Sequence, residues 1–323
     1  MTQIVAVDIG GTHVRFALAE VAGGNVVSLG EATTMNTGDF TSLEDAWGAY
    51  GATLGHALPA AVAISFAGPV HGDVLKLTNN PWIIRPSLAR RSLGVGTMTL
   101  INDFAAVGHA VAHVPADQMH AVCGPDRALP DVGTISVVGP GTGLGVAHVL
   151  KWKGGYHVNE TEGGHIDFAP LDPLEDRIVA TLRKRFRRVS AERIVSGPGL
   201  HNLYEVLADG QADARIFNSD GQLWTAAMAG SDRFAAQALE RFCLALGAVA
   251  GDIALAQGGS GLVIAGGLGL RLADLLPGSG FPHRFRDKGR FEMYMSEIPV
   301  KVLLHPQPGL LGAAAAYAGE HRD

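Results

Sequence analysis

The sequence predicts an α/β fold in which one unit, two strands joined by a glycine turn, occurs twice. Short apolar strand candidates are mixed with helical stretches along the chain, which is typical of the α/β class. Ile4–Ile9 and Thr134–Val138 are apolar runs, and each is followed by a turn of glycine and threonine and then by a strand of alternating polarity. The two units begin about 130 residues apart, which indicates an internal duplication. Two unrelated hairpins with glycine turns are the alternative.

The first half of the chain is rich in predicted strands. β-branched runs bounded by glycine, proline or asparagine predict strands, and apolar residues at helical spacing predict helices. The predicted strands are Ile4–Ile9, Val14–Leu18, one beginning at Asn25–Val27, Ala61–Phe66 and Thr97–Ile101, and the predicted helices are Leu43–Leu58 and Phe104–Val114. Asp103 stands at or near the N-cap of the second helix.

The second half is more helical. Here the predicted strands are Thr134–Val138, Leu144–Leu150, Leu262–Ile264 and Val300–Leu304, and the predicted helices are Leu174–Phe186, Gly199–Leu207, Arg233–Gln257 and Leu310–Ala318. Gly154 and Gly155 close a second hairpin, and Pro308 and Gly309 open the last helix.

Composition narrows the class of protein. A chain of 323 residues with 47% hydrophobic and 17% charged residues has enough core for about two domains. The net charge of −6 shows no excess of positive charge that would indicate binding to nucleic acid. No run of apolar residues reaches the ~18 that a membrane span needs. Two cysteines make neither a disulfide framework nor a zinc knuckle. Met1–Val7 lacks a basic targeting region, so we expect a cytoplasmic protein.

Three glycine turns directly follow predicted strands. They are Asp8-Ile9-Gly10-Gly11-Thr12, Gly139-Pro140-Gly141-Thr142-Gly143 and Ala265-Gly266-Gly267. Glycine lets backbone N–H groups converge on an anion, and threonine adds a hydroxyl donor, so these turns are candidate phosphate sites. Ordinary hairpin turns are the alternative. The chain has neither a P-loop pattern nor a dinucleotide fingerprint.

Asp103 ends a strand and opens a helix, beside Asn102. A carboxylate in this position can accept a proton from a bound hydroxyl, and the neighbouring amide can fix a second hydroxyl. A plain N-cap aspartate is the alternative interpretation.

Three further polar residues are candidate ligand contacts. Glu162 and His165 flank two glycines, a spacing that suggests a tight loop aiming both side chains at one ligand, and Glu192 lies in a polar stretch. Metal binding is the competing interpretation for Glu162 and His165, but the spacing matches no zinc pattern. A neutral polyol fits better, since several carboxylates would repel an anionic substrate.

Two other features have plain interpretations. Arg183–Arg193 carries six basic residues in eleven, most simply a solvated face rather than a nucleic-acid contact. Trp82 could line a pocket or pack in the core.

The chain resembles the bacterial ATP-dependent glucokinases of the hexokinase–actin clan over nearly its whole length. The segments that carry the resemblance are Asp8–Thr12, Ile101–Phe104, Gly141–Gly145, Glu162–Phe168, Ser190–Arg193, Ser196–Leu200, Ala265–Gly267 and Asp287–Phe291. The resemblance implies a duplicated actin-like ATPase (ribonuclease H-like) fold, α/β in class, with two domains and an interdomain cleft. Residues 1–113 plus 304–323 would form a small α/β domain, and residues 114–303 a large one.

By position, the resemblance also implies roles for single residues. Asp103 resembles the general base, and the residues that resemble glucose ligands are Asn102, Asp103, Glu162, His165 and Glu192. The turns Gly10-Gly11-Thr12 and Gly141-Thr142-Gly143 resemble phosphate loops, Gly266 and Gly267 the adenosine contact, and Asp8 the carboxylate that approaches Mg²⁺ through water. The similarity is to the branch without zinc, because Ile166–Glu175 contains no cysteine. Asp287–Phe291 has no role beyond the resemblance.

The resemblance implies a glucokinase, with glucose and ATP as partners, Mg²⁺ but no zinc, and a homodimer that contacts neither nucleic acid nor membrane. Three alternatives stay open: a kinase of the same fold for another neutral hexose, a sugar-binding regulator without catalysis, and an actin-like ATPase or filament protein. A regulator would need a DNA-binding extension, and the first predicted strand begins within the first few residues.

Overall fold

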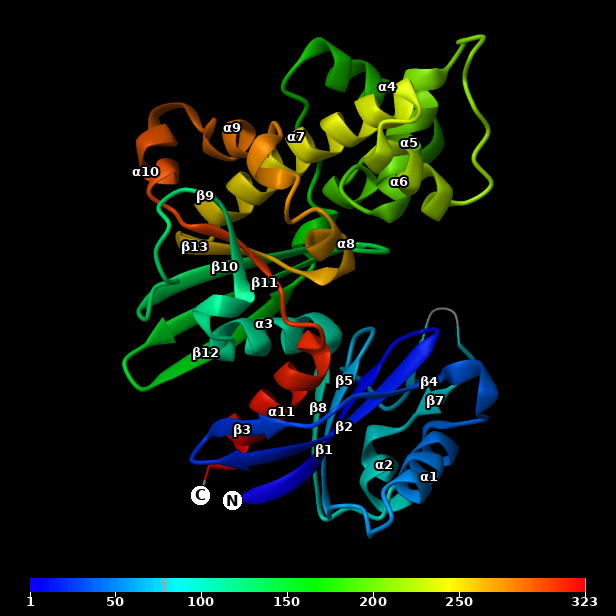
Figure 1. The fold of residues 1–323 in the computed structure, drawn as a ribbon, viewed down its shortest axis with the longest axis vertical. Coiled ribbons are helices and arrows are strands. Elements are labelled where there is room, and N and C mark those ends of the chain that lie inside the picture. Colours follow the sequence, from blue (N-terminus) through cyan, green and yellow to red (C-terminus); the bar gives the residue numbers. More distant parts are fainter. Residues whose placement is uncertain (78–79, 323) are drawn as a thin grey trace. The chain divides into compact units, whose positions relative to one another are not determined.

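The computed structural model describes residues 1–77 and 80–322. The chain divides into two compact units. Unit 1 comprises Met1–Pro115, Val158–Glu160 and His305–Asp323, and unit 2 comprises Ala116–His157 and Thr161–Leu304. Figure 1 shows the elements coloured along the sequence.

Unit 1 is built on a sheet with the strand order β3-β2-β1-β5-β8, and β4 pairs with β2. β1 is antiparallel to β2 and parallel to β5, and β5 is parallel to β8. The strands of this unit are β1 (Thr2–Ile9), β2 (His13–Ala22), β3 (Asn25–Leu29), β4 (Thr33–Asn36), β5 (Ala61–Phe66), β6 (Leu75–Lys76), β7 (Ile83–Ile84) and β8 (Thr97–Asn102). Its helices are η1 (Thr37–Asp39), α1 (Leu43–Thr53), α2 (Pro86–Ser92), α3 (Asp103–His113) and α11 (Pro308–Glu320).

The two faces of this sheet are covered by different helices. On one face Tyr50 of α1 stacks on Phe16 of β2, with ring centroids 4.8 Å apart. On the other face α11 buries Leu310 and Tyr317 against Ile4 of β1. Figure 1 shows α11, in red, against strands from the start of the chain. The sheet is therefore buried on both sides, which explains the near-continuous apolar runs of β1 and β5.

A second sheet has the strand order β12-β11-β10-β13-β14-β9, and apart from Val158–Glu160 of β12, which are grouped with unit 1, it belongs to unit 2 together with most of the helices. The strands are β9 (Met119–Cys123), β10 (Gly133–Pro140), β11 (Leu144–Trp152), β12 (Gly155–Thr161), β13 (Gly259–Ile264) and β14 (Val300–Leu303). The α-helices are α4 (Pro173–Phe186), α5 (Gly197–Ala208), α6 (Asp220–Ala229), α7 (Arg233–Ala256), α8 (Gly266–Arg271), α9 (Phe281–Arg286) and α10 (Glu292–Ser296). Short 3-10 turns are η2 (Ala116–Gln118), η3 (Gly163–His165), η4 (Ala191–Arg193), η5 (Leu276–Gly278) and η6 (Gly289–Phe291).

The predicted duplication is confirmed by the strand order. The path β3-β2-β1-β5-β8 of the first sheet is matched by β12-β11-β10-β13-β14 of the second sheet. The strand senses match as well: β10 is antiparallel to β11 and parallel to β13, and β13 is parallel to β14. Two unrelated hairpins would not share a five-strand order, so that alternative is wrong.

One predicted helix boundary and one alternative interpretation need correction. The helix predicted over Leu43–Leu58 ends at Thr53, because Gly55 adopts a positive φ of 68° that a helix cannot continue through. Asp103 lies next to the N-cap of α3, as predicted, but the alternative that it is itself the cap is wrong, since the Asn102 side chain accepts the N–H groups of Phe104 and Ala105. Asp103 is therefore the first residue of the helix, and its carboxylate is not the cap.

Candidate active site

In unit 1, Asp8 lies one residue before the end of β1, directly opposite Arg15 of β2. Ser65 of β5 donates its hydroxyl to Asp8 Oδ1 at 3.0 Å, and Arg15 Nη1 lies 3.3 Å from Asp8 Oδ2. Burial raises the pKa of Asp8 in spite of these two favourable contacts. The carboxylate is thus held in one orientation by the sheet itself.

The first turn of α11 also approaches this carboxylate. A Cβ atom on Gly309 would lie 2.6 Å from Asp8 Cγ, so only glycine allows the helix to come this close. The positive end of the helix dipole then faces a negative group, which is the favourable arrangement.

The turn Gly10-Gly11-Thr12 links β1 to β2 and is braced by η1. Thr37 donates its hydroxyl to Gly11 O and its N–H to Thr12 O, both at 2.9 Å, and Gly10 N–H donates to His13 O. The carbonyl groups of the turn are therefore tied to the protein. This fixes the turn in a shape suited to presenting N–H groups to an anion.

Asn102 and Asp103 stand where β8 becomes α3. Asn102 Oδ1 accepts the N–H groups of Phe104 and Ala105 at 2.8 and 3.2 Å, while Asn102 Nδ2 donates to Gly68 O at 3.0 Å. An amide nitrogen carries two N–H groups, so Asn102 can offer a ligand a donor but has committed its acceptor.

The pKa of Asp103 suits a general base. Burial, and secondly the negative charge of Asp8, raise the pKa of Asp103 to about 6. A base whose pKa lies just below neutral is ionised at pH 7 and still takes up a proton readily.

In unit 2, the turn Gly141-Thr142-Gly143 links β10 to β11, as Gly10-Gly11-Thr12 links β1 to β2. Gly141 N–H donates to Gly143 O at 2.8 Å, and Gly197 N–H at the start of α5 donates to Gly141 O at 2.7 Å. A small cavity of about 50 Å³ opens beside Thr142. Its other lining residues are Glu192, Arg193, Ser196, Pro198 and Asn202.

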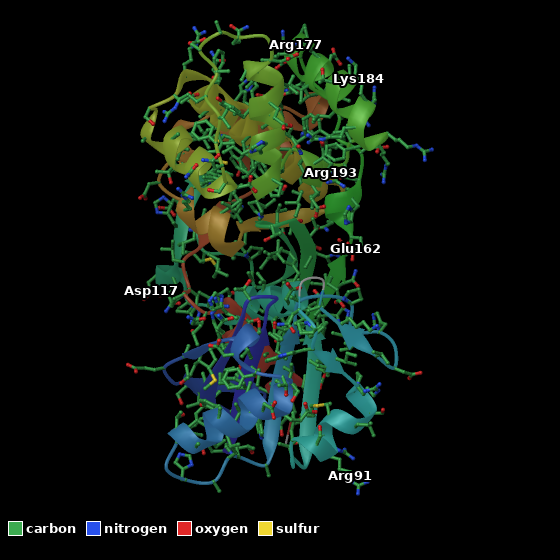
Figure 2. The ribbon with its side chains drawn as sticks, turned by 90° about the vertical axis from the view of Figure 1, so that its right-hand side faces the viewer. Arg91, Asp117, Glu162, Arg177, Lys184 and Arg193 are labelled. Atoms are coloured by element: carbon green, nitrogen blue, oxygen red, sulfur yellow. The ribbon has the colours of Figure 1, made fainter. Side chains whose placement is uncertain are left out.

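Glu162 and His165 lie at the two ends of a tight loop, as their spacing predicted. A Cβ atom on Gly163 would meet the Val146 side chain at 2.9 Å, and one on Gly164 would overlap the Leu144 carbonyl oxygen, so both glycines are required. His165 Nε2 lies 3.7 Å from Glu162 Oε2. Glu162 is largely exposed, and Figure 2 shows it on the face of unit 2 turned toward the viewer.

Glu192 is brought to this loop by backbone pairing. Asp167 and Ser190 form an isolated bridge, and Ala191 N–H donates to Ile166 O at 2.8 Å. Glu192 Oε1 then lies 4.0 Å from His165 Nδ1, while Glu192 Oε2 accepts Leu144 N–H at 3.0 Å. The structure thus brings together Glu162, His165 and Glu192. Over the described ranges 1–77 and 80–322, no group of three or more His, Cys, Asp or Glu side chains could hold a metal ion.

The third glycine turn lies beside the end of β10. Gly266 opens α8 with a φ of 81°, and a Cβ atom there would lie 3.2 Å from Pro140 O. Ala265 N–H donates to Val138 O at 2.9 Å. Within unit 2, Gly266 and Gly267 therefore lie near the start of the Gly141–Gly143 turn.

The remaining sequence features have structural explanations. Trp82 is buried and donates Nε1–H to Phe40 O at 3.0 Å, so it packs in the core of unit 1. Lys288, from the segment Asp287–Phe291, crosses α7 to reach Ala248 O at 3.0 Å and Asp252 at 2.8 Å. In the basic stretch, Arg185 pairs with Glu205.

Sequence reasoning missed three residues that hold Asp8: Ser65, Arg15 and Gly309. Ser65 is fully buried in the otherwise apolar strand Ala61–Phe66, and a single hydroxyl in such a run is a signal that it has a polar partner. Gly309 carried no signal, because its partner is 301 positions away in the chain.

Two sheets of one strand order, each with a glycine turn after its first strand, and a partly buried carboxylate of raised pKa are typical of a phosphoryl-transferring enzyme of the duplicated actin-like ATPase fold. The comparisons with known proteins narrow this class. The family model described as Glucokinase matches residues 5–320. The chain belongs to the glucokinase family.

Individual relatives agree with this assignment. A glucokinase of Zymomonas mobilis subsp. mobilis is 60% identical over 321 residues, which cover 99% of both chains. The crystal structure of a glucokinase from an Antarctic psychrotroph has a TM-score of 0.86 at 32% identity, covering 98% of both chains. A ROK family glucokinase of Streptomyces griseus, solved in complex with glucose and AMPPNP, has a TM-score of 0.61 at 22% identity. It covers 99% of this chain and 100% of its own, and this likeness shows the fold alone.

Proposed function

We propose that this protein transfers the γ-phosphoryl group of ATP to the 6-hydroxyl of glucose, giving glucose 6-phosphate and ADP. The single observation that carries the proposal is Asp103, a carboxylate at the start of α3 whose pKa is raised to about 6. Family membership supplies the sugar and the nucleotide.

In the proposed reaction Asp103 accepts the proton of the 6-hydroxyl while that oxygen forms its bond to the γ-phosphorus. The bond between the γ-phosphorus and the bridging oxygen breaks, and ADP leaves with the electron pair. Positioning and electrostatic stabilisation supply most of the acceleration in reactions of this kind. The proposed base acts on one hydroxyl, so other groups must fix the remaining hydroxyls of the ring.

Asn102 contributes an N–H donor, and Glu162, His165 and Glu192 are proposed as the other sugar ligands. In unit 2, His165 lies 3.7 Å from Glu162 and 4.0 Å from Glu192, and the three side chains offer both acceptors and a donor, which suits the alternating hydroxyls of a pyranose.

The turns Gly10–Thr12 and Gly141–Gly143 are proposed to bind the nucleotide phosphates, and Gly266 and Gly267 to contact the adenosine. Asp8 suits Mg²⁺, since its carboxylate is a hard oxygen ligand already oriented by Ser65 and Arg15. Bound there through water, Mg²⁺ would neutralise charge on the phosphates.

The proposal extends to the branch of the family, the location, the oligomeric state and the domain boundaries of the protein. We place the chain in the branch of the family without structural zinc, within the hexokinase–actin clan, and propose a cytoplasmic homodimer. We also propose that residues 1–113 plus 304–323 and residues 114–303 are its two domains, a division supported by the two compact units. None of the helices in residues 1–77 and 80–322 has the length and hydropathy needed to cross a bilayer.

A coupled assay of ADP release across a hexose panel, with and without Mg²⁺, tests the function. We expect turnover that requires both glucose and Mg²⁺ and is fastest with glucose. Faster turnover with fructose, mannose or an amino sugar would assign another hexose. Glucose binding without turnover would indicate a regulator, and sugar-independent ATP hydrolysis would indicate an actin-like ATPase.

A further inference from the structure

The segment from Ser190 to Pro198 holds the Gly141–Gly143 turn from both sides. At one end Gly197 N–H donates to Gly141 O at 2.7 Å. At the other end Glu192 Oε2 accepts Leu144 N–H, directly after the turn, at 3.0 Å. The turn is therefore shaped by η4 and the start of α5, and not by its own glycines alone.

The contact between Glu192 and the turn is tight. A Cβ atom on Gly143 would lie 2.5 Å from Glu192 Oε2, whereas one on Gly141 would meet nothing within 4 Å. An alanine at position 143 would therefore press against the Glu192 carboxylate, whereas an alanine at position 141 would not contact it.

The backbone that carries Glu192 is anchored on α5 and α4, so a methyl group on Gly143 would displace the Glu192 carboxylate rather than the segment. Asn202, which is buried, donates Nδ2–H to Arg193 O at 2.7 Å and accepts from Arg185. The Arg193 guanidinium lies 4.2 Å from the centre of the Phe186 ring, whose other neighbour is Arg185 at 4.3 Å. Figure 2 shows Arg193 below the α4 residues Arg177 and Lys184 on the same face of unit 2.

The two oxygens of Glu192 face different partners. Oε2 faces the turn, while Oε1 lies 4.0 Å from His165 Nδ1, beyond hydrogen-bond distance. We propose that Glu192 is a positioning residue for the Gly141–Gly143 phosphate turn as well as a ligand of the sugar, so that one carboxylate links the two binding sites. This rests on the proposed function, in which Glu192 binds glucose.

A shared carboxylate has a thermodynamic consequence. A change that displaces Glu192 from the turn should weaken sugar binding even when no nucleotide is present, and the coupling is reciprocal. The link can therefore be tested from the nucleotide side with a substitution that removes no polar group.

The first experiment compares Gly143→Ala with Gly278→Ala in titration calorimetry of glucose binding without nucleotide. Loss of a hydrogen bond to a charged group weakens binding by about tenfold or more, so Gly143→Ala should raise the Kd for glucose by about that factor. Gly278→Ala, in η5 and outside the proposed binding residues, meets nothing within 4 Å and should leave the Kd for glucose within about twofold. An unchanged Kd in Gly143→Ala overturns the inference, whereas a wild-type protein that binds no glucose overturns the proposed function instead.

A double-mutant cycle separates a shared contact from general damage to the fold. Because Gly143→Ala and Glu192→Ala act on the same contact, their effects on the Kd for glucose should be far from additive. Additive effects contradict the inference.

A second measurement does not depend on the folding of Gly143→Ala. The Kd for AMPPNP, titrated with Mg²⁺ and without sugar, should rise about tenfold in Glu192→Ala. Glu192→Gln keeps an oxygen that can accept Leu144 N–H, so it should restore most of the AMPPNP affinity while glucose binding stays weak. Equal AMPPNP affinities in Glu192→Ala and the wild type would overturn the proposed role.

Discussion

At Asp103, burial and the charge of Asp8 act in the same direction: both disfavour the ionised carboxylate and raise its pKa to about 6. Below that pH the group is protonated and cannot take the proton of a hydroxyl. We therefore expect kcat/KM to be level above about pH 7 and to fall about tenfold per pH unit well below 6. A pH profile of the kinase reaction measures this.

The contribution of Asp8 can be isolated in the same profile. Asp8→Asn removes the neighbouring negative charge, so the pKa of Asp103 should fall and the acid limb should move to lower pH, whatever the loss of overall rate. An acid limb that stays in place would mean that Asp8 does not influence the base.

Replacement of Asp103 by asparagine should separate chemistry from stability. Asp103→Asn should lower kcat by about 10²- to 10⁴-fold, the usual share of a general base. Because the raised pKa means that the fold disfavours the ionised carboxylate at neutral pH, the variant should also have a higher Tm. Retention of more than about half of the wild-type kcat would reduce Asp103 to a structural residue at the start of α3.

At the scale of elements, the first turn of α11 fixes how Asp8 is presented. Gly309→Ala places a methyl group 2.6 Å from Asp8 Cγ, so we expect the carboxylate to be displaced and kcat to fall by about 10- to 100-fold. Gly319→Ala, in the same helix, meets nothing within 4 Å. It should keep wild-type kinetics and stabilise the protein by up to about 1 kcal/mol in thermal unfolding. Equal kinetics in the two variants would contradict the role of α11.

An ion-pair cluster joins three helices of unit 2. Asp172, the N-cap of α4, lies 2.6 Å from Arg241 of α7 and 2.8 Å from Arg284 of α9. Burial alone would raise the pKa of Asp172, but the backbone N–H of Glu175 and the two arginines outweigh it and lower the pKa below 3.8. The stabilisation is therefore present at neutral pH and is lost as the pH falls below that value.

Urea denaturation at neutral pH measures how much this cluster contributes to the free energy of unfolding. Asp172→Asn keeps an acceptor for the cap but removes the carboxylate that pairs with Arg241 and leaves Arg284 paired with Glu175, so the free energy of unfolding should fall by about 1–3 kcal/mol. Asp167→Asn, which breaks the exposed pair with Arg188, should cost less than about 1 kcal/mol. If both variants cost the same, the cluster contributes no more than a surface pair.

The sequence predicted most of the elements around the two glycine turns, because apolar strands flanked by glycine have a strong local pattern. It failed where the pattern is short or the partner is distant. β9 and α8–α10 are only five or six residues long, too short for a helical or strand period to show. The turn Glu162–His165 was foreseen from its two glycines, but the bond between Glu192 and Leu144 joins a side chain to a backbone N–H 48 residues away. No side-chain pattern marks a backbone donor.

At the scale of the whole molecule, the proposed function limits how fast ATP can be hydrolysed without sugar. Water carries the same nucleophilic group as a sugar hydroxyl and is far more concentrated, so a site that is always complete would hydrolyse ATP. We expect ADP release without sugar to be at least about 100-fold slower than with saturating glucose. ATP hydrolysis at a comparable rate without sugar would contradict a site completed by its acceptor.

The position of α11 near the end of the sequence has a consequence for how the protein folds during synthesis. Its helix covers the face of unit 1 formed by β1, β2 and β5, yet it follows all of unit 2 in the chain. A ribosome that adds about 5–20 residues per second therefore exposes the apolar side of the first-made sheet for many seconds before its cover exists. During synthesis, the half of the protein that emerges first is the half most in need of a chaperone.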